Sequence, residues 1–328
     1  MDDWIVQNSK KRWTSFVQWK INLSCVCPGI LDGESSHIVL FLLGYKLVLS
    51  LYVKKQYNAL ICEERYFKSM KGSRLEACIS YIRFTLINEG CESENFDEKF
   101  FEEILTGDAD ADLLVQEYIE KLGLKREEVA SDKIFAKYPG TRCLANYYAI
   151  KDKENLDEVD RMLSAIRTAQ ILAHPLEMPL SLEYLVSLHK HMFGDLYPSA
   201  GLFRRKTAAK RTEFVPPEMI ERMLKELMDK LEATDWLRKL DEDDDDWDFL
   251  SELAYFMGEL EAIHPFVDGN GRVTRFFISY IASRAGYYIS WGSADPDHVL
   301  EASIAAIDGD YQALVDLLEE ITIPMEDN

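Results

Sequence analysis

The chain has 328 residues, of which 47% are apolar and 29% charged, a composition typical of a soluble globular protein with a sizeable core. Its formal net charge of -21 argues against a nucleic-acid partner held through phosphate contacts. Six scattered cysteines without a Cys-x-x-Cys pair favour reduced thiols in a cytoplasmic protein over a zinc site or a disulfide framework.

Residues 1–72 contain several aromatic residues but no motif that can be interpreted. Within them, His37–Val53 is rich in Leu, Val and Ile, but it is interrupted and shorter than the roughly 20 apolar residues of a membrane span. Two short strands, 38–43 and 46–53, with a turn at Gly44, fit this segment better. The sequence also opens without a secretory signal, so we expect a cytoplasmic protein without a membrane segment.

Residues 73–126 have the pattern of short helices. Ser73 is a candidate N-cap for the first helix, and Gly90 ends it. The apolar residues at helical spacing are Leu75, Ile79, Ile82 and Leu86. Two further helices are expected near 97–105 and 110–122.

From about residue 130 onward the helical signal is strong. Apolar residues three or four apart predict helices around Leu156–Ile166, Leu182–Leu188, Met219–Leu231, Phe249–Ile263, Val273–Tyr280, Pro296–Ile307 and Tyr311–Glu320. The spacing within Phe249–Ile263 predicts a helix at the centre of the core. Only residues 203–216 look extended in this half, so the predicted class is mainly α.

A loop between two of these helices contains the features that are expected of an anion-binding site. Pro265 ends the preceding helix, and Gly269 and Gly271 let the backbone turn sharply and approach a ligand. A new helix begins near Arg272, and the free N–H groups and positive dipole end of a helix start attract anions. The Gly269-Asn270-Gly271 segment can fold as a nest of N–H groups for a phosphate.

Reactive side chains surround this helix start. Histidine titrates near neutral pH, so His264 is a candidate to take a proton from an attacking hydroxyl. Asp268 is the only carboxylate in the loop and suits Mg²⁺, which binds through one or two carboxylates plus substrate phosphates. Arg272 and Arg275 can both reach a polyphosphate. Each residue alone is more often structural, and their joint occurrence carries the prediction of phosphoryl-type transfer.

The segment His264–Arg275, HPFVDGNGRVTR, resembles the signature of the Fic (Fido) family, HxFx(D/E)GN(G/K)RxxR, with every fixed position filled. The resemblance implies transfer of AMP from ATP to a Tyr, Ser or Thr hydroxyl with release of pyrophosphate. It assigns the base to His264, the Mg²⁺ ligand to Asp268 and a core position to Phe266. The groups that would hold ATP are Gly269, Asn270, Gly271, Arg272 and Arg275.

The resemblance extends over roughly residues 130–322. Leu185–Arg204 is similar to the family segment that leads into a substrate flap, although Ser199 replaces the usual Trp. Residues 203–216 would form the flap, a hairpin that aligns the target by strand addition. The flap residues expected to face the target are Arg204, Arg205, Lys206 and Thr207. The start of the domain, Tyr138-Pro139-Gly140-Thr141, resembles the bacterial toxin and effector branch. His189 and His191 are interpreted as structural.

Thr85-Leu86-Ile87-Asn88-Glu89-Gly90 resembles the inhibitory motif of the family, (S/T)xxxE(G/N). Thr85 and Glu89 lie one helical turn apart beside the apolar stripe, so docking of this helix would bury Glu89. The resemblance implies that Glu89 pairs with Arg275 and denies it to the γ-phosphate. Residues 73–126 as a whole are similar to the small three-helix antitoxin that accompanies bacterial Fic toxins.

These observations predict an autoinhibited, ATP- and Mg²⁺-dependent protein adenylyltransferase with a mainly α, Fic-type helical bundle and a small β-hairpin flap. The predicted regions are 1–72 of unknown role, 73–126 as the antitoxin-like inhibitory module and 127–328 as the Fic domain. Transfer of phosphate, UMP or phosphocholine, removal of AMP, and a non-catalytic nucleotide-sensing module remain as alternatives. A bacterial topoisomerase subunit is the first target to test, and the sequence leaves a homodimer open.

Overall fold

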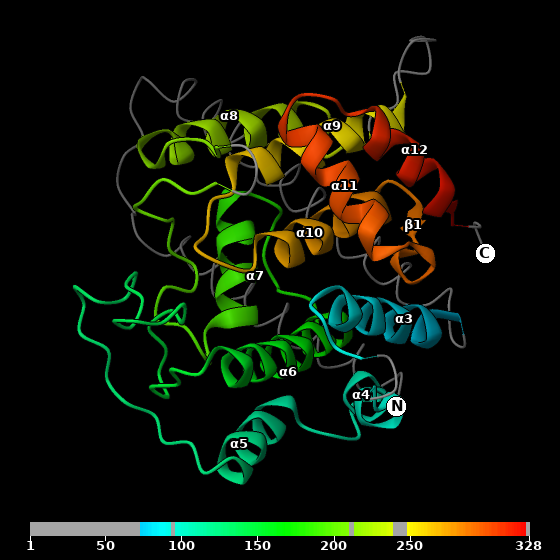
Figure 1. The fold of residues 1–328 in the computed structure, drawn as a ribbon. Coiled ribbons are helices and arrows are strands. Elements are labelled where there is room, and N and C mark those ends of the chain that lie inside the picture. The colour runs from blue at the N-terminus through cyan, green and yellow to red at the C-terminus, as the bar shows by residue number, and fades with distance from the viewer. Residues whose placement is uncertain (1–72, 93–95, 210–212, 239–247, 326–328) are drawn as a thin grey trace, which may run out of the picture. The chain divides into compact units, whose positions relative to one another are not determined.

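The computed structural model describes residues 73–92, 96–209, 213–238 and 248–325, which belong to one compact unit, Leu60–Asn328. The helices are α3 (Ser73–Asn88), α4 (Glu98–Thr106), α5 (Ala111–Lys121), α6 (Lys153–Ala173), α7 (Leu182–Phe193), η3 (Pro217–Met219), α8 (Ile220–Ala233), α9 (Phe249–Ile263), α10 (Asn270–Arg284), η4 (Trp291–Ser293), α11 (Pro296–Ile307) and α12 (Gln312–Ile321) (Figure 1). The class is mainly α, as predicted. The strands expected within residues 38–53 lie outside the described residues.

Many of these helices begin at an aspartate whose side chain accepts hydrogen bonds from N–H groups of the first turn. The aspartates in this position are Asp97, Asp110, Asp152, Asp248 and Asp295. A carboxylate there satisfies donors that have no partner inside the helix and complements the helix dipole. Part of the strong negative charge of the chain therefore fixes where its helices begin.

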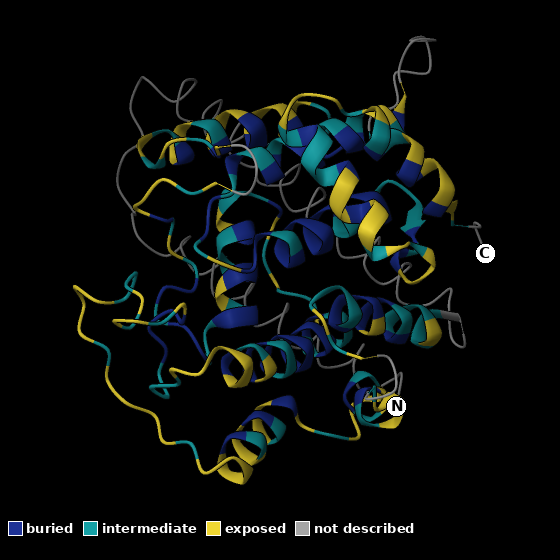
Figure 2. Ribbon diagram, viewed as in Figure 1, coloured by how far each residue is buried: buried dark blue, intermediate teal, exposed yellow. Residues whose placement is uncertain are grey.

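The core is centred on α9 and α10, which pack against each other. Leu253, Phe256, Met257 and Leu260 of α9 are all buried, so the predicted central position of this helix is confirmed. Figure 2 shows α10 buried along most of its length, whereas α5 and α11 carry exposed outer faces. Among the described residues, no helix combines the length and the hydropathy that crossing a bilayer requires.

A pair of short strands lies outside the helices that the sequence predicts. β1 (Tyr287–Ile289) pairs antiparallel with β2 (Thr322–Pro324), with Tyr288 opposite Ile323. The expectation that only residues 203–216 are extended in this half is therefore wrong. A strand of three residues is too short to show the alternation of apolar and polar residues that identifies a strand in a sequence. The pairing also depends on helices that bring the two segments together.

The predicted flap is a hairpin. Ala209 and Glu213 form an antiparallel bridge, and the Phe214 N–H donates to the Ala208 carbonyl over 3.0 Å. The flap follows α7 and leads into η3 and α8, so it connects elements on one side of the core.

The predicted helices of residues 73–126 are α3, α4 and α5, and all three contact α6. α3 also contacts η4, where Phe84 stacks on Trp291 with ring centroids 5.9 Å apart. Asp112 of α5 forms an ion pair with Arg167 of α6. These three helices therefore pack against the remainder of the described fold, while the boundary at residue 126 stays a prediction.

Candidate active site

The loop between α9 and α10 turns sharply at both of its ends. His264 adopts a left-handed conformation (φ 45°, ψ 61°), and its N–H still donates to the Leu260 carbonyl over 3.0 Å. Gly269 lies at φ +77°, and a Cβ there would approach the Phe193 ring to 2.4 Å. Glycine is therefore required at position 269 both by conformation and by space, as the loop interpretation predicts.

Two side chains hold the loop from inside. Asn270 accepts a hydrogen bond from the Phe266 N–H (2.8 Å) and donates one to the Phe266 carbonyl (2.9 Å). Phe266 is buried, as predicted, and stacks on His189 with ring centroids 3.8 Å apart. The side chain of Asn270 thus shapes the loop, and the part of Asn270 left for an anion is its backbone N–H.

His189 fixes the loop from α7. Its Nδ1 accepts a hydrogen bond from the Gly201 N–H (2.9 Å), and Nε2 donates to the Asp268 carbonyl (3.0 Å). Burial lowers the pKa of His189 to about 4, with the Asp268 carbonyl opposing the shift and Arg272 adding to it. The ring is therefore neutral near pH 7. This geometry supports the predicted structural role of His189.

The start of α10 offers hydrogen-bond donors to an anion. Val273 is the first residue whose N–H bonds back to the loop, with the Gly269 carbonyl at 3.1 Å. Among the described residues, no backbone acceptor pairs with the N–H groups of Asn270, Gly271 or Arg272. The exposed Asp268 side chain lies beside them and accepts from the Gly269 N–H over 2.8 Å. A phosphate would find three N–H groups and the positive end of the helix here.

The flap is pinned to the residues around His264. The His264 ring stacks on Phe214 of the flap, with centroids 3.7 Å apart and planes 3° apart. Arg204 donates from Nε to the His264 carbonyl (2.7 Å) and from Nη2 to the Ile263 carbonyl (3.2 Å). The sequence did not point to Phe214, because an aromatic residue in an extended segment is not a specific signal of a functional site.

The flap residues expected to face the target fall into two groups. Arg204 is buried, and its guanidinium also donates to the carbonyls of Lys206 and Val215. Its side chain therefore anchors the flap and does not face a target. Arg205, Lys206 and Thr207 are exposed.

Arg272 is held by a buried carboxylate that the sequence analysis did not single out. Its Nη1 and Nη2 donate to the two oxygens of Asp160 on α6 (2.9 and 3.1 Å), and Nη1 also donates to Ser164 (2.9 Å). Tyr197 donates its hydroxyl to the same Asp160 over 3.3 Å. Burial by itself would lower the pKa of Arg272, but Asp160 and Glu89 raise it, so the guanidinium stays charged.

A weak signal for Asp160 and Ser164 was present in the sequence. They lie four residues apart and directly follow Val159 and Leu163, which belong to the apolar stripe of α6. Polar residues on the buried side of a helix need partners. The sequence does not reveal that their common partner is Arg272, which lies 112 residues from Asp160 and 108 from Ser164.

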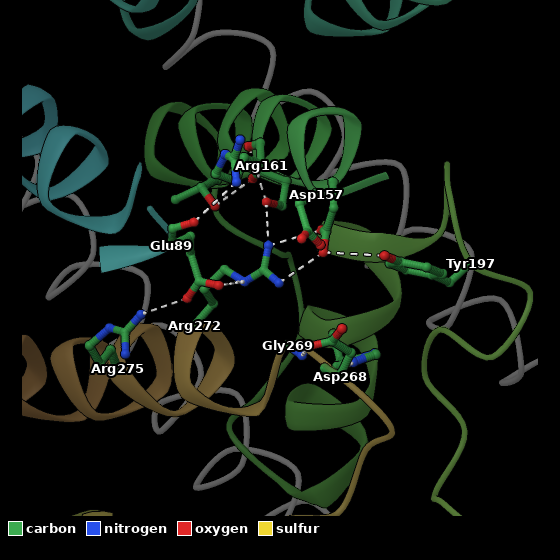
Figure 3. A network of polar contacts seen from close by, with 12 residues as sticks. Glu89, Asp157, Arg161, Tyr197, Asp268, Gly269, Arg272 and Arg275 are labelled. Carbon is green, nitrogen blue, oxygen red and sulfur yellow. Dashed lines mark hydrogen bonds and ion pairs between the residues drawn. The ribbon is translucent and has the colours of Figure 1, made fainter. Parts of the chain in front are cut away.

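Glu89, one residue beyond α3, faces both arginines of the loop (Figure 3). Its Oε1 lies 3.6 Å from Arg275 Nη2, and its Oε2 lies 3.7 Å from Arg272 Nε. Arg161 of α6 donates to the Glu89 carbonyl over 3.2 Å. The predicted pairing with Arg275 is present, Arg272 is a second partner that the sequence did not indicate, and the expected burial is incomplete because 30% of the Glu89 side chain is exposed. Thr85, one turn earlier on α3, is buried.

Most of the residues predicted for the site thus meet along the first turns of α10. Figure 3 shows Glu89 between Arg272 and Arg275, with Asp268 and Gly269 at the start of the helix. The arrangement combines a helix start whose first N–H groups have no backbone acceptor among the described residues, an exposed carboxylate, two buried cationic side chains and a carboxylate that engages both of them.

Comparisons with known proteins agree with this geometry. The profile of the Fic/DOC family matches residues 179–282. The chain is 33% identical over 178 residues to probable protein adenylyltransferase y4lH of Sinorhizobium fredii, covering 54% of this chain and 90% of that protein. It is 32% identical over 181 residues to protein adenylyltransferase VbhT of Bartonella schoenbuchensis, covering 55% of this chain but 37% of VbhT. The crystal structure of BepC, an effector from Bartonella tribocorum with bound AMPPNP, superposes with a TM-score of 0.51 at 26% identity, over 58% of this chain and 96% of that one.

Proposed function

The chain belongs to the Fic/DOC family, and from this premise we propose that it is an autoinhibited protein adenylyltransferase. It transfers AMP from ATP to a Tyr, Ser or Thr hydroxyl of a target protein and releases pyrophosphate. The relatives that align with half of this chain are named for this activity, and BepC was crystallised with an ATP analogue. The chain spans little more than a third of VbhT, so substrates and partners of that longer protein are not transferred to it.

The proposal that the enzyme is inhibited rests on one observation. The carboxylate of Glu89 lies within 3.7 Å of both arginines of the loop. Arg272 and Arg275 are nearly fully buried, so their charges are poorly screened and attract an anion strongly. Glu89 and the phosphates of ATP are anions that compete for the same guanidinium groups. While Glu89 is docked, ATP lacks the contacts that would align it for transfer.

The two arginines are arranged differently toward a nucleotide. Asp160 occupies the Nη1 and Nη2 end of Arg272 and leaves the edge that carries Nε directed at Glu89. Departure of Glu89 would expose an edge that is already oriented by Asp160. Preorganised donors stabilise developing charge without a further reorganisation cost. Arg275, one turn further along α10, would hold the terminal phosphate.

His264 acts on the target hydroxyl. The hydroxyl oxygen attacks the α-phosphorus, the bond from that phosphorus to the bridging oxygen breaks, and pyrophosphate leaves. His264 takes the proton of the attacking hydroxyl. Its left-handed backbone and its stacking on Phe214 fix the imidazole at the foot of the flap, where a bound target segment would pass.

Asp268 fits a role as the protein ligand of Mg²⁺. Among the described residues, no three His, Cys, Asp or Glu side chains are grouped so that they could hold a metal by themselves. A single exposed carboxylate beside an anion-binding helix end suits Mg²⁺, which takes its other ligands from phosphates and water. When bound, Mg²⁺ would neutralise charge on the phosphates and orient them.

The expected outcome of Glu89→Gly is a rise of at least about tenfold in AMP transfer, because two buried arginines become available to the nucleotide. Incubation of the variant and the unchanged chain with α-labelled ATP and a bacterial lysate measures this. Adding His264→Ala should abolish transfer while nucleotide binding persists. Label transfer undiminished by the histidine change would refute the role of His264, and equal transfer with and without Glu89 would refute the inhibition.

The target protein is open to direct tests. The likeness of the domain start to the bacterial toxin branch makes a bacterial topoisomerase subunit the first candidate, and purified subunits can be incubated with the Glu89→Gly variant. Mass spectrometry of the product distinguishes AMP from phosphate, UMP or phosphocholine. Gel filtration distinguishes a monomer from a homodimer, which the sequence leaves open.

A further inference from the structure

The flap offers an unpaired backbone edge next to His264. Both of its ends are pinned, because the Arg204 N–H donates to the Pro265 carbonyl (2.8 Å) and the Val215 N–H donates to the Ala262 carbonyl (3.2 Å). Beyond Arg204, the N–H groups of residues 205–207 pair with no backbone acceptor in the described part of the chain. These residues are also exposed. An extended peptide can pair with such an edge.

The edge has a charge opposite to that of the chain. Residues 203–209 contain three basic residues and no acidic residue, in a chain of net charge -21. Arg204 is committed to backbone carbonyls, so the described cations that face solvent here are Arg205 and Lys206. Neither forms an ion pair with a carboxylate of the described residues, while ion pairs are found at several other exposed sites.

Arg205 is held in place although it is exposed. Its guanidinium lies 4.8 Å from the centre of the Phe135 ring, a cation–π contact with the segment that precedes α6. A charge held on a neighbouring ring loses less side-chain entropy when it meets an anion. Opposite charges across a contact mainly set which partner binds and in which register.

We propose that the flap selects target segments that carry Asp or Glu close to the hydroxyl that receives AMP. This inference rests on the proposed function, since it concerns the substrate of the same site. The Arg204 N–H is bonded to the carbonyl of Pro265, next to His264, and Arg205 and Lys206 follow directly. Because a strand advances about 3.3 Å per residue, the acidic residues are expected within about three positions of the modified one. The repulsion between an acidic target and the negative chain is screened beyond about 8 to 10 Å at physiological salt, and the contacts at the flap decide the choice.

The modified sites themselves test the proposal. The Glu89→Gly variant is incubated with ATP and a bacterial lysate, and peptides that carry AMP are sequenced by mass spectrometry. Acidic residues should be enriched within three positions of the modified hydroxyl, relative to all Tyr, Ser and Thr residues of the same lysate. Modified sites without this enrichment would overturn the proposal while leaving adenylyl transfer intact.

A charge reversal provides the second arm. Adding Arg205→Glu and Lys206→Glu to the Glu89→Gly variant should reduce label at the acidic sites by about tenfold, because two attractive contacts become repulsive. Binding of a fluorescent ATP analogue should be unchanged. Lys99→Glu combined with Lys121→Glu is the matched control, since both lysines are exposed, on α4 and α5, and the same change in net charge there should leave the labelled sites as they are.

The outcomes of the two arms separate the inference from its premise. If the same sites are labelled equally after the charge reversal, the flap charges do not select the target. The inference about acidic targets would then be wrong, while adenylyl transfer would stand. If the Glu89→Gly variant binds ATP and places AMP on no protein at all, adenylyl transfer itself fails, and the inference falls with it.

Discussion

Gly269 illustrates how a single position serves the site through its backbone. Its positive φ and the Phe193 ring, 2.4 Å from where a Cβ would lie, exclude a side chain. The residue that follows, Asn270, holds Phe266 with its side chain, and its N–H opens the turn that is proposed to bind an anion. The loop therefore presents its hydrogen-bond donors in fixed positions, and stabilisation of a transferring phosphate requires donors that are fixed in advance.

His189 makes the loop sensitive to acid. Its pKa is lowered from 6.5 to about 4 by burial, so between these values the unfolded chain binds a proton that the folded chain does not. The free energy of unfolding should therefore fall as the pH falls from 6.5 toward 4, by about 2 kcal/mol from this residue between pH 7.5 and pH 5. Urea denaturation at several pH values, on the unchanged chain and on His189→Gln, measures the difference.

The glutamine variant does not titrate in this range. It should be less stable than the unchanged chain near neutral pH, because it cannot reproduce both hydrogen bonds of His189, and should lose less stability on acidification. Identical losses in the two proteins would mean that His189 does not carry the effect.

The proposed inhibitory contact depends on how the end of α3 meets α6 and α10. α3 ends at Asn88, and the Glu89 carbonyl that follows accepts a hydrogen bond from Arg161 of α6. A cation at the C-terminus of a helix also complements the helix dipole. Arg161 therefore holds the segment that places the Glu89 carboxylate between Arg272 and Arg275.

Arg161→Ala should partly release the inhibition. Loss of one such hydrogen bond costs about 1 kcal/mol, which corresponds to about fivefold more of the released state. AMP transfer by the otherwise unchanged chain should rise by about this factor in the labelled-ATP assay. In the Glu89→Gly background the same substitution should add nothing, and a similar rise there would place Arg161 outside the inhibitory contact.

Within the described fold, α3 packs against elements that lie far from one another in the sequence. It packs on α6 from one side and on η4 from the other, where Trp291 stacks on Phe84 and donates to Ser279 of α10 over 2.7 Å. Gly292 allows this close approach, because a Cβ there would lie 1.7 Å from the Ser80 Oγ. The docking of α3 is thus coupled to the core that carries the loop.

Gly292→Ala should push α3 away from η4 and raise AMP transfer. Overpacking of this kind costs about 2 kcal/mol, equivalent to roughly 30-fold in the equilibrium between docked and released α3. Ser80→Ala removes the nearest clashing atom and should return transfer most of the way toward the original rate. The labelled-ATP assay on both variants measures this; an alanine at 292 that leaves transfer unchanged would argue against α3 as the mobile element.

The sequence alone determined the helical class, the positions of the main helices and the contents of the loop. Helix periodicity is local information, and so are the aspartates that begin several of the helices. The loop from His264 to Arg275 carries its chemistry in consecutive residues, so its donors, carboxylate and arginines could be assigned before the fold was known. The Glu89 motif could be recognised in the same way.

The tertiary structure decided which partners these residues have. Asp160 and Arg272 are 112 residues apart, Phe214 reaches His264 only because the flap is pinned there, and Arg204 turns inward to carbonyls of α9. Likewise, Glu89 engages both arginines and β1 pairs with β2 only after the helices have packed. The physical reason is that periodicity and motifs encode local conformation and chemistry, whereas the direction of a buried polar side chain is set by the partner that the whole fold brings within reach.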